Sequence, residues 1–419
     1  MKILWITNIL FPEAKEKISE RSRSVGGGWM IGAATALIEQ ANIQLYIATV
    51  SAQVKELTRI NGEKMVYYIL PKGKGNTKKN PEYEYYWNIV QKEVTPDIVH
   101  IHGTEFSHGL AYINICGNEN VVISIQGLTS AIYPYLYYGL NWWQLLRNIT
   151  LRDIIMGNSY TVYKGLKRRG EYEKEMISKV HHVIGRTSWD RARIWAINPD
   201  AKYHFCNETL RPEFYDDKWE YEKCDKHSIF LSGGTAELKG FHMLLKAMPY
   251  ILRYYPDTVV RVAGGDVTRC SANWKERIKL TNYGKIIKKM IKKYGLKDKI
   301  SFTGSLSAAQ MKSEFLKSNV FVLPSSIENS PNSLGEAQLL GVPCISSYVG
   351  GTMDFILNKD CGELYRFEEV EMLAFKICQT FETSHLFDNA EMRKVAAKRH
   401  DSKHNAEVLS QIYQHMLND

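Results

Sequence analysis

Short apolar runs alternate with helix-forming stretches along the whole chain. In the first half, the pattern predicts β-strands at residues 2–8, 43–49, 65–70, 97–103, 121–127 and 181–187. Several of these runs are apolar at consecutive positions, which is typical of parallel strands covered on both faces. The alternation of strand and helix therefore predicts a parallel α/β sheet with crossover helices.

The same rhythm begins again after a charged, loop-like interval at residues 211–227. The second half carries predicted strands at residues 228–234, 258–265, 300–305, 320–326 and 343–348. A chain of 419 residues exceeds the usual size of one domain, so we expect two doubly wound α/β domains in series. Ligands of such sheets bind outside the carboxyl ends of the strands, and we expect the site in the cleft between the domains.

The composition argues against several classes of protein. No apolar run approaches the ~20 residues that a membrane span needs, and the start MKILWITNIL lacks the features of a signal peptide. The seven cysteines are scattered without a close CxxC pair, which argues against a zinc site or a disulfide framework. We therefore expect a reducing, cytoplasmic setting.

The net charge of +9 is concentrated in two lysine-rich stretches, residues 71–80 and 285–299. These stretches are either a solvated loop and a solvated helix face, or surfaces that attract anionic lipid head groups or phosphorylated substrates. We find no recognisable nucleic-acid-binding motif, so nucleic acid is not an expected partner.

The segment SSIENSPNSLGEA follows a predicted strand and predicts the start of a helix. Ser330 is a good N-cap, and Pro331 suits the first helical position because its missing N–H would be unpaired there. The helix dipole and the free N–H groups would then favour an anion such as a phosphate at Asn332, Ser333 and Leu334.

Two acids, Glu328 and Glu336, flank this helix start. Ionised carboxylates accept hydrogen bonds from both hydroxyls of a diol, so the pair suits the ribose and the hexose on either side of a diphosphate. On spacing alone, they are equally explained as acids favoured near a helix N-terminus.

Two other strand ends carry residues suited to a phosphate ligand. Lys239 and Gly240 open a predicted helix after the first strand of the second half, where a lysine can meet a diphosphate as a point charge, although a lone lysine is more often a surface residue. Residues 26–28 form a triple glycine, where backbone can approach a ligand closely. The spacing of Gly26, Gly28 and Gly32 misses the GxGxxG dinucleotide fingerprint by one residue, which argues against an NAD-dependent dehydrogenase.

Taken together, the order and spacing of these motifs resemble the retaining GT-B glycosyltransferases of family 4, a group 1 glycosyl transferase family of bacterial polysaccharide and glycolipid synthesis. The resemblance covers nearly the whole chain and rests on GGGW, PDIVHIHG, VIGRTSWDRA, NETLRPEFY, KGFHMLLKA, ISFTGSLSAAQM and PSSIENSPNSLGEAQLLGVPCISSYVGG. It implies two Rossmann-like domains facing each other across a cleft. Their expected ranges are 1–208 for the acceptor and 209–395 for the nucleotide sugar, with 396–419 as a helix returning to the first domain.

The family's residue roles transfer onto matching positions. The resemblance implies that Glu336 binds the nucleotide ribose, that Glu328 lies near the donor sugar, and that Lys239 holds the diphosphate. The amides of residues 332–334 would bind phosphate and sugar oxygens, and Gly26, Gly27 and Gly28 would close over the donor.

The chain departs from the family in two places. Many members carry an arginine where this chain has Gly233 and Gly234 in the donor-binding stretch, so Arg211 or Arg186 is expected to supply the second positive charge. Many members also carry a histidine near the reacting sugar, where this chain has Gln126. A glutamine can bind a sugar hydroxyl but cannot act as a general base near neutral pH.

Residues 130–156 are rich in aromatic side chains, among them Trp142 and Trp143. We expect them on the acceptor side of the first domain together with His102, whereas His100 suits a packed structural role. The aromatic stretch is either an insertion with its own core, a platform for sugar rings, or, beside Arg147, a membrane contact.

The resemblance thus implies a cytoplasmic retaining glycosyltransferase, and peripheral contact with the cytoplasmic face of the membrane stays one of the open alternatives. The enzyme would transfer a hexose from a UDP- or GDP-sugar to a glycan or lipid-linked acceptor, without a cofactor or an essential metal. The alternatives are a GT-B-like nucleotide-sugar epimerase and a non-catalytic glycan- or nucleotide-binding protein with a decayed donor site.

Overall fold

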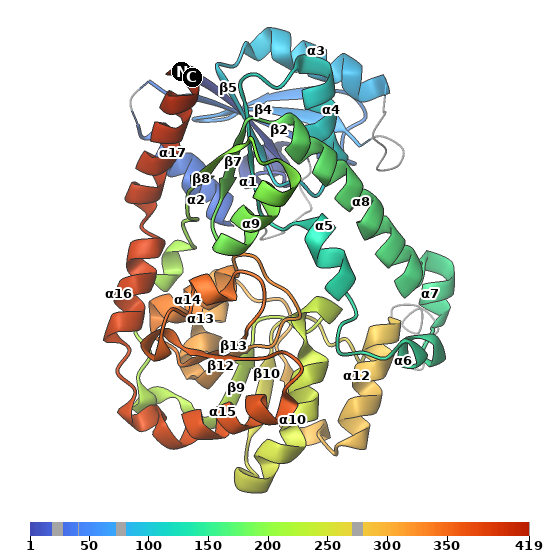
Figure 1. Cartoon of the computed structure of the whole chain (residues 1–419), viewed down its shortest axis with the longest axis vertical. Helices are drawn as coiled ribbons and strands as arrows, with labels where there is room; N and C mark the ends of the chain where they lie inside the picture. The colour runs from blue at the N-terminus through green and yellow to red at the C-terminus, as the bar shows by residue number, and fades with distance from the viewer. Residues whose placement is uncertain (19–27, 41, 73–80, 270–279, 419) are drawn as a thin grey trace. The chain divides into compact units, whose positions relative to one another are not determined.

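The computed structural model (Figure 1) describes the chain except residues 19–27, 41, 73–80, 270–279 and 419. Its contacts divide the chain into two compact units. Unit 1 comprises Met1–Ala131, Leu166–Leu210 and Arg399–Asp419, and unit 2 comprises Ile132–Gly165 and Arg211–Lys398.

Unit 1 is built on a sheet in the order β3-β4-β2-β1-β5-β6-β7-β8, in which neighbours run parallel except for the β3–β4 pair. Its strands are β1 Lys2–Thr7, β2 Gln44–Ser51, β3 Thr58–Asn61, β4 Val66–Pro71, β5 Ile98–His102, β6 Val121–Ser124, β7 His182–Gly185 and β8 Lys202–Phe205.

Unit 2 is built on a parallel sheet in the order β11-β10-β9-β12-β13-β14. Its strands are β9 Asp225–Leu231, β10 Val259–Val262, β11 Ile300–Phe302, β12 Ser318–Leu323, β13 Cys344–Ser347 and β14 Glu363–Tyr365.

Helices connect the strands in both units, as the parallel pairing requires. In chain order they are α1 Pro12–Ile18, α2 Gly28–Ile38, α3 Pro81–Val94, α4 Ser107–Cys116, α5 Thr129–Ile132, α6 Trp142–Arg147, α7 Leu151–Met156, α8 Ser159–Lys179, α9 Ser188–Ile197, α10 Phe241–Tyr254, α12 Asn282–Lys293, α13 Ala308–Lys317, α14 Asn332–Leu340, α15 Val370–Thr383, α16 Ala390–Arg399 and α17 Ser402–Asn418.

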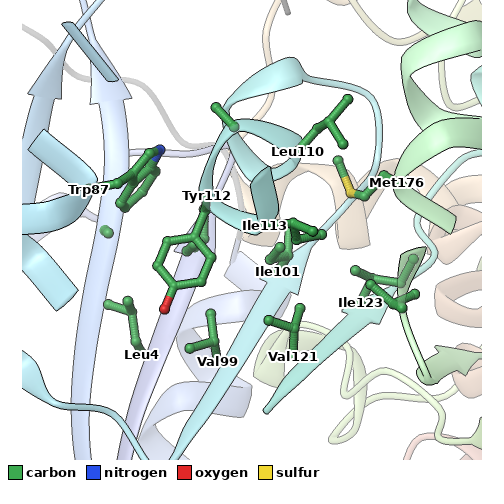
Figure 2. Packing of buried hydrophobic residues seen from close by; sticks show 14 of the residues in the cluster. Leu4, Trp87, Val99, Ile101, Leu110, Tyr112, Ile113, Val121, Ile123 and Met176 are labelled. Atoms are coloured by element: carbon green, nitrogen blue, oxygen red, sulfur yellow. The ribbon is translucent and has the colours of Figure 1, made fainter. Parts of the chain in front are cut away.

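Successive strand residues point to opposite sides of a sheet, and in unit 1 the residues on both sides are buried. On one face, Leu4 and its neighbours pack against Trp87 of α3, Tyr112 of α4 and Met176 of α8 (Figure 2). On the other face, the core includes Trp5 and residues of α2 and α17. The apolar runs of the sequence are therefore explained by covering helices on both sides.

Three strands fall outside the predicted set, and all three lie at sheet edges: β3, β8 and β14. An edge strand lacks a neighbour on one side, so it need not carry the continuous apolar run that marks a central strand. The predicted C-terminal helix is two helices, α16 and α17. The helix is interrupted between them at His400, whose Nδ1 donates to the carbonyl of Glu208 at 2.7 Å.

Residues 132–165 lie in unit 2, whereas the predicted range 1–208 placed them in the first domain. Polar contacts hold this segment on α10 and α12. Lys246 Nζ donates to the carbonyl of Gly139 at 2.8 Å, and Asn282 Nδ2 donates to Ser159 Oγ at 2.6 Å. The aromatic stretch is thus attached to unit 2, and the expected attachment of Trp142 and Trp143 to the first domain is wrong. Residues 399–419 belong to unit 1.

Candidate functional site

The loop between β12 and α14 ends in a helix start one residue later than predicted. Pro331 has an extended ψ of 104° and is itself the N-cap residue, without a side-chain cap, so the prediction of Ser330 as N-cap is wrong. Leu334 N–H donates to the carbonyl of Pro331 at 3.0 Å, whereas a helix leaves the N–H groups of its first residues, here Asn332 and Ser333, without a partner inside the helix. The anion-binding capacity of this terminus therefore rests on those two amides.

Two glycines allow backbone segments to approach this loop closely. A Cβ at Gly240, which has a φ of +67°, would lie 1.6 Å from the carbonyl oxygen of Pro324. A Cβ at Gly350, with a φ of +53°, would lie 1.8 Å from the carbonyl oxygen of Glu328, which accepts from Gly351 N–H at 3.0 Å. Because only glycine fits both positions without strain, these residues fix the loop that carries Glu328.

Lys239 and Glu328 come together at the carboxyl end of the sheet in unit 2. Lys239 Nζ donates to Glu328 Oε1 at 2.6 Å, and Ser325 Oγ donates to the same oxygen at 2.6 Å. Ser326 N–H donates to the carbonyl of Leu238 at 2.8 Å, which ties the lysine segment to the loop. The lysine side chain remains 41% exposed, so its ammonium group is accessible to a ligand.

Glu336, inside α14, is buried and paired with Arg211, which immediately precedes the 3₁₀ turn Pro212–Phe214. Arg211 Nε donates to Glu336 Oε1 at 2.7 Å, and Nη2 donates to Oε2 at 2.8 Å. Burial raises the pKa of Glu336, and the guanidinium opposes this shift. Each carboxylate oxygen has a further lone pair, so the paired acid can still accept from a diol.

These groups, called here the polar surface of unit 2, all lie on the segment from β12 to α14 or contact it. It combines a helix N-terminus, an accessible ammonium group and two oriented carboxylates. The Oδ1 atom of Asn332 is buried there without a hydrogen-bond partner among the residues that the structure describes. A buried acceptor in this state calls for a donor, such as a water or a ligand hydroxyl.

At the carboxyl edge of the unit 1 sheet, the structure adds Glu105 to the predicted residues. Glu105 accepts from Gly127 N–H at 3.1 Å and from Asn8 Nδ2 at 3.0 Å, and a Cβ at Gly103 would lie 3.3 Å from Gln126 Oε1 and 2.3 Å from Glu105 Oε2. Burial raises the pKa of Glu105 to about 7. Its place two residues after the predicted strand DIVHIHG was the sequence signal for this residue.

His102 ends β5 and is buried, with its ring 4.2 Å from that of Trp5 and 3.8 Å from that of His100. Neither ring nitrogen of His102 has a hydrogen-bond partner within the described parts of the chain. Burial holds its pKa well below the usual value, so the ring is neutral. It lines a cavity of about 40 Å³ in unit 1, which has room for ordered water but not for a sugar nucleotide.

Arg186 also lines that cavity, in unit 1, and is buried. Its guanidinium is paired with Glu208 and lies 5.6 Å from the centre of the Trp29 ring. With both candidate arginines already paired to acids, a diphosphate would have to displace Glu208 or Glu336 to recruit either of them. This pairing weakens the expectation that Arg186 or Arg211 replaces the family's arginine.

The remaining predicted residues are placed as follows. Gly28 is the first residue of α2, whereas Gly26 and Gly27 lie outside the described residues. A Cβ at Gly233 would meet its nearest neighbour, Lys239 Cγ, at 4.0 Å, so this position lies beside the lysine. Trp142 and Trp143 begin α6 and are exposed.

Within the described ranges, no group of three or more His, Cys, Asp or Glu side chains is arranged to hold a metal ion. Among the helices of those same ranges, none is long and apolar enough to cross a membrane.

Comparison with known proteins identifies the part of the chain that carries the unit 2 site. Residues 214–400 match the family described as glycosyl transferases group 1. This segment is therefore similar to group 1 glycosyl transferases. The Bacillus subtilis (strain 168) protein YtcC, provisionally named a glycosyltransferase, is 28% identical over 200 residues, which cover 46% of this chain and 46% of YtcC. The match thus spans about half the length of that relative.

The solved structures extend the likeness to the whole chain. Sucrose-phosphate synthase from Thermosynechococcus elongatus superposes with a TM-score of 0.69 at 15% identity, covering 100% of both chains. Alr3699/HepE from Anabaena, solved in complex with UDP and glucose, gives a TM-score of 0.66 at 13% identity, covering 99% of each chain. At such identities the likeness shows the fold, so the predicted GT-B architecture of two parallel-sheet α/β units is confirmed.

Proposed function

We propose that the protein is a cytoplasmic glycosyltransferase that transfers a hexose from a UDP- or GDP-sugar to a glycan or lipid-linked acceptor, with retention of anomeric configuration and without an essential metal. The observation that carries the proposal is the polar surface of unit 2, where Lys239, Glu328, Glu336 and the start of α14 gather at one sheet edge. The group 1 domain match covers these residues except for position 211 of the Glu336 pair.

The chemistry of this surface fits the charge changes of the reaction. When the bond between the sugar C1 and the phosphate oxygen breaks, negative charge builds up on the diphosphate. The ammonium group of Lys239 and the amides at the start of α14 are fixed before the reaction, so they can stabilise that charge without reorganising. Glu336 would accept the ribose hydroxyls, and Glu328 would accept hydroxyls of the sugar.

The contacts of Glu328 favour one route to retention over another. Its Oε1 accepts from both Lys239 and Ser325, which withdraws electron density from the oxygen that a covalent mechanism would use as nucleophile. We therefore favour attack by the acceptor hydroxyl from the face that the leaving phosphate occupies. In that route a phosphate oxygen takes the acceptor proton, and Glu328 orients the sugar.

On unit 1, the proposed acceptor edge offers neutral partners for hydroxyl groups. Gln126 and Asn8 carry amides, and Glu105 changes between its protonated and ionised forms near pH 7. Such groups hydrogen-bond sugar hydroxyls without requiring a charged acceptor. Superposition on HepE, which binds UDP and glucose, is compatible with the sugar-nucleotide class of donor.

Thermal unfolding in the presence of UDP, GDP, ADP and their glucose or mannose conjugates tests the donor site directly. A ligand at 100 times its Kd should stabilise the protein by ~2.7 kcal/mol, a shift of a few degrees. Glu336→Ala should abolish the shift. Glu314→Ala is the matched control, because Glu314 also pairs with an arginine of unit 2, at 2.9 Å, yet lies outside the candidate surface.

A shift with one nucleotide that survives Glu314→Ala and disappears in Glu336→Ala would support the proposal and identify the base. Hydrolysis of the bound nucleotide sugar then separates a working donor site from a decayed one. If the folded protein shows no shift with any nucleotide, the proposed donor site is wrong, and the decayed-site alternative stands.

A further inference from the structure

Unit 2 exposes an unusual concentration of large apolar side chains on α6, α7 and the turn between them. The two helices are labelled in Figure 1. Trp143 is 66% exposed, and Ile154 and Met156 are each 72% exposed. The set, called here the apolar patch, consists of Trp142, Trp143, Leu146, Ile149, Leu151, Ile154, Ile155 and Met156. Large exposed apolar patches on folded proteins mark binding surfaces.

The helices of the patch are built to keep their shape without a core of their own. A capping box of Asn141 and Gln144 begins α6, and one of Thr150 and Asp153 begins α7. In α7 the buried residue is this capping aspartate, so its apolar side chains all remain on the outside. The exposure of the patch therefore does not result from frayed ends.

A basic helix adjoins the patch. Lys285 of α12 donates through Nζ to the carbonyl of Ile149 at 3.3 Å, between α6 and α7. Lys288, Lys289 and Lys292 follow at helical spacing and share that helix face, and all three are exposed. Between residues 132 and 165 the single acidic residue is Asp153, which is buried in its cap. The helix face next to the patch is thus positively charged, and Glu237, an acid outside this segment that lies near Asp153, is largely buried.

We propose that the apolar patch docks unit 2 on a lipid bilayer that contains anionic lipids. The tryptophans and aliphatic side chains would enter the interfacial region, where such residues are favoured, and the α12 lysines would bind lipid phosphates. A second copy of the chain is a poorer occupant, because it would present the same basic helix to this one. The proposal does not depend on the donor chemistry of unit 2.

Sedimentation with vesicles tests the docking. The full chain should bind vesicles of phosphatidylcholine mixed with phosphatidylglycerol, bind pure phosphatidylcholine weakly, and dissociate in high salt. The triple variant Trp143→Ser, Ile154→Ser, Ile155→Ser should lower the partition coefficient on the order of tenfold. Its matched control is Leu357→Ser, Phe375→Ser, Leu386→Ser, which removes similarly exposed apolar residues from elsewhere on unit 2 and should bind normally.

The contribution of the α12 lysines to vesicle binding is tested with a double variant and a matched control. Lys288→Glu with Lys292→Glu, one turn apart on α12, should weaken binding to the anionic vesicles by at least about tenfold. Lys394→Glu with Lys398→Glu, at the same spacing on α16, should leave it unchanged. The triple serine control and the double glutamate control each change the net charge by the same amount as the variant they are compared with.

Failure of the full chain to bind anionic vesicles would overturn the proposal, as would equal losses in test and control variants. A dimer in light scattering that the triple serine variant dissociates would show that a second copy covers the patch instead. Nucleotide-induced thermal shifts remain a separate readout, so a failed docking proposal and a failed donor-site proposal give different results.

Discussion

The acids at the carboxyl edges of the two sheets have different partners. In unit 2, Glu328 is paired with Lys239 and Glu336 with Arg211. In unit 1, Glu105 accepts from neutral amide groups and burial raises its pKa to about 7, while burial keeps His102 neutral. The two acids of unit 2 thus each have a cation as partner, whereas Glu105 and His102 of unit 1 favour their uncharged forms. Unit 1 keeps one buried charged pair beside them, Arg186 with Glu208.

This difference indicates what each edge can bind. A buried charge is costly unless it is paired, so an edge that keeps oriented charges is suited to a charged ligand such as a diphosphate. An edge of neutral hydrogen-bonding groups suits hydroxyls, which carry no charge to compensate. Substitutions in each unit test this difference.

Arg211→Ala should have the largest effect on stability, because it leaves the buried Glu336 without its cation. Breaking a buried ion pair in this way costs about 3 to 5 kcal/mol. Burial already raises the pKa of Glu336, and the loss of the guanidinium raises it further, so the penalty should be larger at pH 8 than at pH 5, where protonation of the carboxyl group is more favoured. Urea unfolding at both pH values measures this. The double variant Arg211→Met, Glu336→Leu should recover most of the lost stability. A destabilisation by Arg211→Ala that does not change with pH would contradict the pairing of an ionised Glu336 with Arg211.

Glu105→Gln tests the neutral edge through the pH dependence of stability. Below pH 4.5 the carboxyl group is protonated in both the folded and the unfolded chain, whereas between 4.5 and about 7 it is ionised mainly in the unfolded chain. The free energy of unfolding should therefore fall as the pH rises through this window, by about 2 to 3 kcal/mol from this group. The variant should lack this component of the slope and be more stable than the native chain at pH 8.

The matched control for that experiment is Glu175→Gln on α8, an acid of unit 1 with a surface ion pair to Lys179 at 3.2 Å. It should leave the slope nearly unchanged, since an exposed pair contributes little. An unaltered slope in Glu105→Gln would show that Glu105 is ionised in the folded protein.

Gly240→Ala should destabilise unit 2 by about 2 kcal/mol, because the residue has a positive φ and its Cβ would collide with the carbonyl of Pro324. The displaced loop should also weaken nucleotide binding, since Lys239 is the adjacent residue. Gly233→Ala is the control, because its Cβ meets nothing closer than 4.0 Å and its φ is not positive. Thermal unfolding of both variants, with and without nucleotide, separates strain from the loss of a small residue. Equal stability of the two would contradict the close approach.

Lys239→Ala should have the smallest effect on stability, below about 1 kcal/mol, because its pair with Glu328 is partly exposed to solvent. Its expected effect is on the reaction: loss of a fixed cation at the leaving diphosphate should lower kcat for donor turnover on the order of a hundredfold. Lys246→Ala, which removes a lysine bonded to the Gly139 carbonyl, serves as the control. Unchanged donor turnover in Lys239→Ala would remove the lysine from the mechanism.

Much of the fold could be predicted because central parallel strands carry their burial in the local sequence. The runs around β1, β5, β9 and β12 are apolar at successive positions, and each was predicted within a few residues. The edge strands β3, β8 and β14 were missed, since a strand with one neighbour is stabilised by its pairing rather than by a recognisable pattern. The N-cap was misplaced by one residue because the backbone conformation of Pro331, not its residue type, decided where the helix began.

For the candidate site, the residue types at the strand ends could be predicted from the sequence: Lys239, Glu328, Glu336 and the helix start between the acids. Their partners depend on the folded chain, which pairs Arg211 with Glu336, gives Glu105 neutral amide donors, and attaches the aromatic segment to unit 2. The two kinds of feature differ in how far apart along the chain the interacting residues lie. Periodicity and capping depend on residues a few positions apart, whereas the charge state of a buried group depends on side chains that distant segments bring into contact with it.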